Sequence, residues 1–154
     1  MSQYKIPDEP APGLYSKFAV SPIWPFISVM FAGVWLSWTW FVINGLAVGS
    51  PTQRKESIWV IAGLLVSVLM VFAILWFSGL DILPKEYIKY AALGLTVWQL
   101  GVTYVLFSLQ SHTIELYEYY GGVLRNGVFV VIAAVLLGNW LLKDLPPVVK
   151  MVLN

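Results

Sequence analysis

The stretch that decides the fold is SIWVIAGLLVSVLMVFAILWFSG, residues 57–79, which carries no charged side chain. A helix needs about 20 apolar residues to cross the hydrocarbon core of a bilayer, and this stretch is long enough. Main-chain groups in lipid must pair within their own segment, so a helix is expected there and not an open sheet. Residues 57–79 therefore predict a membrane-spanning helix.

Three other apolar stretches have a similar length: residues 22–48, 87–110 and 123–142. The loops PTQRKE (51–56) and LDILPKE (80–86) are short, and short loops favour antiparallel neighbours. Charged stripes at helical spacing, which a soluble bundle would show, are missing from these stretches. We predict an all-α integral membrane protein, a four-transmembrane-helix antiparallel bundle with both termini on the same side.

The composition supports a membrane class. Of the 154 residues, 59% are hydrophobic and 11% are charged, whereas soluble domains average about 45–50% and about 25%. The net charge of +1 argues against a nucleic-acid partner, which requires a strongly basic surface. The chain has no cysteine, so disulfides and thiolate metal sites are excluded.

The expected domain organisation follows from these stretches. Residues 1–21 form a polar, Pro-rich N-terminal tail that lacks the pattern of a cleaved signal peptide. Residues 22–145 form the transmembrane domain, and residues 146–154 form a short tail expected to lie along the interface or to dock on a partner. Lys and Arg are more numerous on the side of both tails, so the positive-inside rule predicts cytoplasmic termini, in what we expect to be a bacterial inner membrane.

The segment SHTIELYEYYGG, residues 111–122, contains the only histidine, His112, together with Glu115 and Glu118. On a helix these three residues lie one turn apart, so three potential metal ligands would share a face. The pattern is weak, because metal sites usually draw ligands from several elements. The tyrosines among them favour an ordinary interfacial aromatic belt, and an acidic patch for a partner protein would look the same.

Three tryptophans lie near the middle of expected spans: Trp35, Trp38 and Trp98. Their indole N–H groups should find hydrogen-bond partners, because an unpaired donor in hydrocarbon is costly. They would line a pocket for a lipid, quinone or pigment tail, or, as we favour, fill the interior or meet a neighbouring subunit. Gln99 is the deepest strongly polar group and marks a face that another helix can approach closely. Arg125 stands at the start of the last span.

No charged residue or histidine lies in the middle of an expected span, which argues against proton relays, ion-coupled carriers and voltage sensors. A histidine at a membrane edge argues against haem, and the sequence shows neither a phosphate-binding loop nor a hydrolase triad. We therefore expect no catalytic residue, no cofactor and no metal. An enzyme centred on His112, Glu115 and Glu118 is the least favoured interpretation.

The leading hypothesis is a non-catalytic structural or accessory subunit of a multi-subunit or self-assembling membrane complex. Its partners would be the lipid bilayer and either other membrane subunits or copies of itself. The alternative is an oligomeric passive pore or a lipid- or hydrophobic-ligand-binding membrane protein. A pore would be lined by Gln99, Thr96, Thr103 and Asn44.

Overall fold

The computed structural model describes residues 10, 13, 15–80 and 84–153. Most of the expected N-terminal tail and part of the loop at 80–86 therefore lie outside the described residues. Those described form helices and no strand, which confirms the all-α prediction. The elements are a short 3-10 helix η1 (Ser16–Phe18) and the helices α1 (Ile23–Ala32), α2 (Val34–Val48), α3 (Gln53–Gly79), α4 (Lys85–Tyr119), α5 (Val128–Leu141) and α6 (Pro147–Leu153).

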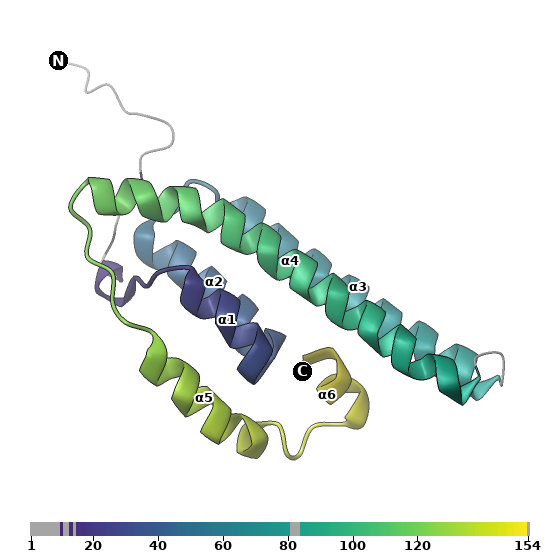
Figure 1. The fold of residues 1–154 in the computed structure, drawn as a ribbon. Coiled ribbons are helices and arrows are strands. Elements are labelled where there is room, and N and C mark those ends of the chain that lie inside the picture. Colours follow the sequence, from purple (N-terminus) through teal and green to yellow (C-terminus); the bar gives the residue numbers. More distant parts are fainter. Residues whose placement is uncertain (1–9, 11–12, 14, 81–83, 154) are drawn as a thin grey trace.

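Helices α3 and α4 form a long antiparallel pair along one side of the molecule (Figure 1). At 1.5 Å per residue they are about 40 Å and about 52 Å long, and both are long and apolar enough to span a membrane. The pair is close at Gly63, whose carbonyl accepts a hydrogen bond from Trp98 Nε1 at 3.3 Å. Helix α4 continues well past the expected end at residue 110 and stops before Gly121, whose φ is 86°.

The prediction of one helix over residues 22–48 is wrong, because the chain reverses at Gly33. This glycine has φ 84° and ψ 179°, a conformation that is essentially restricted to glycine. Beyond it, Ser37 Oγ donates to the Pro25 carbonyl at 2.7 Å. Asn44 pairs with both main-chain groups of Val20, at 2.9 and 3.0 Å. Residues 20–25 thus lie antiparallel to residues 37–44, and α1 and α2 form a helical hairpin.

The hairpin packs on the α3–α4 pair through one buried cluster: Val29, Val34, Trp38, Phe41, Val102 and Leu106. A Cβ atom at Gly63 would lie 2.9 Å from Trp38 Cη2. The absence of a side chain at Gly63 therefore lets the indole reach between α3 and α4.

The expected last span over residues 123–142 is also shorter in the structure. Helix α5 has 14 residues, or about 21 Å, against about 30 Å of hydrocarbon. The residues before it are extended, and Arg125 N donates to the Ala19 carbonyl at 2.8 Å. A Cβ at Gly127 would lie 2.6 Å from Trp24 Cγ. These contacts fix the segment that enters α5 against the beginning of the hairpin.

The C-terminal segment does not project away from the molecule. Helix α6 lies between the end of α5 and the α3–α4 pair (Figure 1). Val152 is 5% exposed and packs with Val71 and Leu95. Its carbonyl accepts a hydrogen bond from Gln99 Nε2 at 2.8 Å. The tail expected at an interface or on a partner thus packs on α3 and α4 of its own chain.

We predict that Gly33→Ala lowers the free energy of unfolding by about 1–3 kcal/mol, because alanine is strained at this φ and ψ. Gly94→Ala is the control, since nothing lies within 4 Å of a Cβ at Gly94 and alanine favours a helix. Thermal unfolding of both variants in detergent measures the difference. A stabilised Gly33→Ala variant would contradict the hairpin and favour a continuous helix.

Candidate functional site

A buried carboxyl group at the start of α3 binds polar side chains from two segments, the connection before α3 and helix α4. The Glu56 side chain is fully buried. Its Oε1 accepts hydrogen bonds from Ser50 Oγ at 2.8 Å and Thr52 Oγ1 at 2.7 Å. Its Oε2 accepts one from Gln110 Nε2 of α4 at 2.7 Å. These three donors are neutral, so the carboxyl group is stabilised by hydrogen bonds and not by an ion pair with any of them.

The network continues from Gln110 to the hairpin. Gln110 Nε2 also donates to the Phe41 carbonyl at 2.5 Å, and its Oε1 accepts from Asn44 Nδ2 at 3.0 Å. The side-chain amide of Asn44 in turn bonds both main-chain groups of Val20: its Oδ1 accepts from the N–H and its Nδ2 donates to the carbonyl. One chain of hydrogen bonds therefore connects α3, α4, α2 and the segment leading into α1. We call Asn44, Ser50, Thr52, Glu56 and Gln110 the Glu56 network.

Close packing surrounds this network. A Cβ at Gly45 would lie 2.5 Å from Glu56 Oε2, so α2 approaches the carboxyl group where it has no side chain. Gln110 is 0% and Asn44 is 1% exposed. Buried polar groups that lose a partner pay the full cost of desolvation, so the members stabilise the fold as a unit.

This network was not predictable from local sequence, because Glu56 belongs to the segment PTQRKE, which has the composition of a loop. Glu56 follows Arg54 and Lys55, and three consecutive charged residues are typical of a solvated loop. The available signal was positional. Asn44, Glu56 and Gln110 each stand at one end of an apolar stretch, and antiparallel helices bring such ends to the same level.

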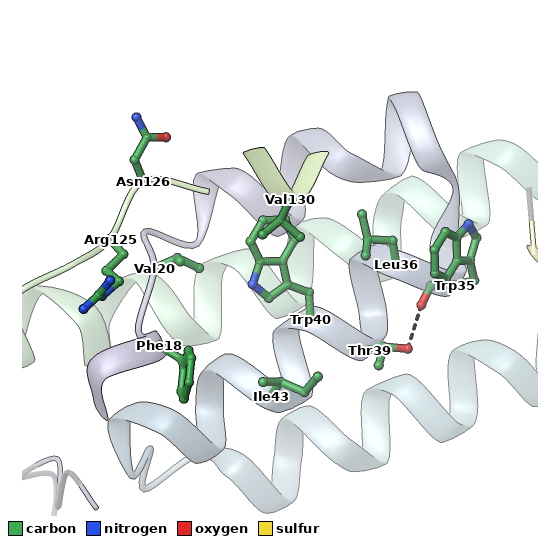
Figure 2. A pocket seen from close by; sticks show the side chains of 10 residues that line it. All are labelled: Phe18, Val20, Trp35, Leu36, Thr39, Trp40, Ile43, Arg125, Asn126 and Val130. Carbon is green, nitrogen blue, oxygen red and sulfur yellow. Dashed lines mark hydrogen bonds between the residues drawn. The ribbon is translucent and has the colours of Figure 1, made fainter. Parts of the chain in front are cut away.

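A second feature is an apolar groove of about 360 Å³ between η1, α2 and the start of α5. Figure 2 shows Arg125 and Asn126 at one end, Trp35 at the other and Trp40 between them. Thr39 Oγ1 donates a hydrogen bond to the Trp35 carbonyl at 2.6 Å, so the hydroxyl adds little polarity to the wall of the groove. The lining residues are Phe18, Val20, Trp35, Leu36, Thr39, Trp40, Ile43, Arg125, Asn126 and Val130.

The three mid-span tryptophans have different surroundings. Trp38 Nε1 donates to Thr103 Oγ1 at 2.9 Å and Trp98 Nε1 to the Gly63 carbonyl at 3.3 Å, so both indole N–H groups have the hydrogen-bond partners expected of them. Trp35 Nε1 is buried and has no partner among the residues that the structure describes. Trp35 alone of the three lines the groove.

The residues expected to line a pore do not share one path within the chain. Asn44 and Thr103 are buried in hydrogen bonds between helices. Gln99 is 4% exposed and holds α6 through its amide. Thr96 and Gln99 border a cavity of about 270 Å³ beside Met30. Any continuous path would therefore need more than one copy of the chain.

The remaining candidates lie on the surface. His112, Glu115 and Glu118 are exposed on the outer side of α4 beyond residue 110, and Arg125 is exposed at the end of the groove. Within the described ranges, no group of three or more His, Cys, Asp or Glu side chains is placed to hold a metal ion. The structure thus does not bring His112, Glu115 and Glu118 together as a ligand set.

Comparisons with known proteins add no assignment, since no protein-family model, no curated protein and no solved structure matches the chain significantly.

We predict that Glu56→Leu lowers the free energy of unfolding by about 3 kcal/mol or more, because it leaves buried donors without an acceptor. Glu115→Leu, at an exposed position of α4, should change the free energy of unfolding by less than about 0.5 kcal/mol. Unfolding in detergent measures both variants. A double variant with Gln110→Leu should be less destabilised than the sum of the single effects, and strict additivity would contradict the Glu56–Gln110 contact.

Proposed function

We propose that the chain is an integral membrane protein in which α3 and α4 cross the bilayer, while the α1–α2 hairpin and α5–α6 enter it from one side without crossing. In each long helix only 28% of the most apolar window is buried. A core helix of a soluble protein would be mostly buried, so these faces fit lipid contact. Helix α1, at about 15 Å, is too short to cross about 30 Å of hydrocarbon.

This arrangement changes the expected sidedness. The hairpin returns residues 49–52 to the side from which residue 20 enters, and Arg125 N bonds Ala19 on the same side. Lys17, Arg54, Lys55 and Arg125 then share one side. The positive-inside rule favours the cytoplasm for that side, and the loop at 80–86 faces the opposite compartment. A bacterial inner membrane remains the proposed location.

We predict that single cysteines introduced into this cysteine-free chain at Gly13 and Pro51 react with a membrane-impermeant thiol reagent from the same side, and one at Glu86 from the other. All three positions are exposed. Labelling of intact and of inside-out vesicles shows on which side of the membrane each cysteine lies. Four complete crossings would instead place Gly13 with Glu86 and leave Pro51 opposite.

Within the membrane the chain acts, in this proposal, as a non-catalytic subunit that works by packing and positioning, in a complex with other membrane subunits or copies of itself. One observation carries this proposal. Beside the turn at Gly33 lies an open cleft of about 220 Å³ between the hairpin tip and α5. Its lining side chains are all apolar although much of its surface is polar, so main-chain groups of the helix ends form that surface.

Lipid chains cannot form hydrogen bonds with such main-chain groups. Non-helical backbone at membrane depth is tolerated where protein covers it or where it borders a water-filled cavity. The main-chain groups of Gly33 itself are hydrogen-bonded, since its N–H donates to the Val29 carbonyl and its carbonyl accepts from Ser37 N. Met30 and Phe31 at the tip remain 73% and 64% exposed. A neighbouring protein segment would cover the cleft in the assembled state, whereas the passive-pore alternative would fill it with water.

We predict that a photo-cross-linking amino acid at Phe31 captures a polypeptide in native membranes, either a second copy or another subunit. The control is Phe72 of α3, which is 58% exposed and lies away from the cleft. Gel mobility and mass spectrometry of the adducts identify the captured species. Lipid adducts alone at both positions would refute the assembly, and solute leakage through liposomes that contain only this chain would favour the pore.

A further inference from the structure

The groove beside α2 has the polarity of a lipid molecule. Its wall on α2 runs from Ile43 to Trp35, eight residues or about 12 Å along the helix. Arg125 and Asn126 flank the Ile43 end, and the Trp35 end is apolar (Figure 2). Trp35 lies two residues from the hairpin tip at Gly33, and Ile43 lies near the residues that pair with Val20. The groove thus passes from a polar end at the hairpin entrance to an apolar end at its tip.

One cation lines the polar end, and a second lies beside the wall of the groove. Arg125 lines the groove and is exposed. Lys17 is exposed on η1, and its Nζ lies 5.5 Å from the centroid of the Phe18 ring, which forms part of the wall. Among the residues that the structure describes, no carboxylate lines the groove. An anionic headgroup is therefore complementary in charge to this end, and a guanidinium is well suited to phosphate.

The shape favours acyl chains. A volume of about 360 Å³ is near the lower end of ligand sites. An adjoining apolar cavity of about 240 Å³ shares Phe18 and Ile43 with the groove and extends to Leu46. Both cavities are open to the surface, so an acyl chain can enter them from outside the protein. Two adjoining apolar cavities beside two cations match a two-chain lipid better than a fatty acid.

We propose that this groove binds an acidic phospholipid, with its phosphate between Arg125 and Lys17 and an acyl chain along α2 toward Trp35. The site rests on the proposed entry of the hairpin into a bilayer. It is separate from the Glu56 network and from the cleft at the hairpin tip, with which it shares no lining residue. In this arrangement the bound lipid occupies the space between α2 and α5, and it contributes to the spacing of the two elements that do not cross the membrane.

The test is native mass spectrometry of the full chain, purified in mild detergent and mixed with equal amounts of phosphatidylglycerol and phosphatidylcholine of identical chains, with oleic acid in a separate arm. The wild-type protein should retain more phosphatidylglycerol than phosphatidylcholine. Arg125→Gln should reduce that retention about tenfold, the effect of losing one hydrogen bond between charged groups. The main-chain bond from Arg125 N to Ala19 does not depend on the side chain, so the fold should persist.

Two further variants separate charge from shape. Arg54→Gln removes an exposed arginine outside the groove and should leave lipid retention unchanged. Thr39→Trp fills the groove and should abolish retention of the lipid. Its thermal unfolding midpoint should shift by no more than that of Arg54→Gln, which shows that the fold is kept. Equal retention of both phospholipids by the wild type, retention of oleic acid alone, or an equal loss in Arg125→Gln and Arg54→Gln would overturn the site. Labelling that places Gly13 and Pro51 on opposite sides would instead overturn the membrane arrangement itself.

Discussion

The hydrogen bond between Gln110 and the buried carboxyl group of Glu56 is the interaction on which the arrangement depends. It joins the two long helices at one end, and through Asn44 it fixes the beginning of the hairpin against them. A carboxyl group removed from water requires several donors, and Ser50 and Thr52 in the short connection before α3 supply them. The connection between α2 and α3 is therefore held by the same group that holds the helices together.

Two separate elements cover the inner side of the α3–α4 pair from this end. The hairpin packs on α4 as far as Val102, and beyond it α6 contributes Val152 against Val71 and Leu95. Gln99 lies between the two contacts and bonds α6. Trp38 fills the first layer, where Gly63 leaves room for its ring. Gln99 thus lies at the boundary between the two packed layers, where its hydrogen bond fixes α6 against α4.

The two long helices were predictable from hydropathy and length alone, because α3 and α4 contain the expected stretches 57–79 and 87–110, although α4 continues to Tyr119. The hairpin was not predictable in the same way, because residues 22–48 are long and apolar enough for a span and a glycine within a helix is tolerated. The reversal becomes evident only in three dimensions, where Ser37 pairs with Pro25 and Asn44 with Val20 across the turn. Glu56 was hidden by its charged neighbours, and the groove by its origin in segments distant along the chain, such as Phe18 and Val130.

The turn at Gly33 also has an electrostatic consequence. A helix carries a partial negative charge of about half an electron at its carboxyl end and an equal positive one at its amino end. In the hairpin the carboxyl end of α1 and the amino end of α2 are adjacent, joined by a single residue. Their opposite partial charges largely offset each other. The tip therefore has hydrogen-bonding groups but little net field, and it favours a neutral polar contact over either a cation or an anion.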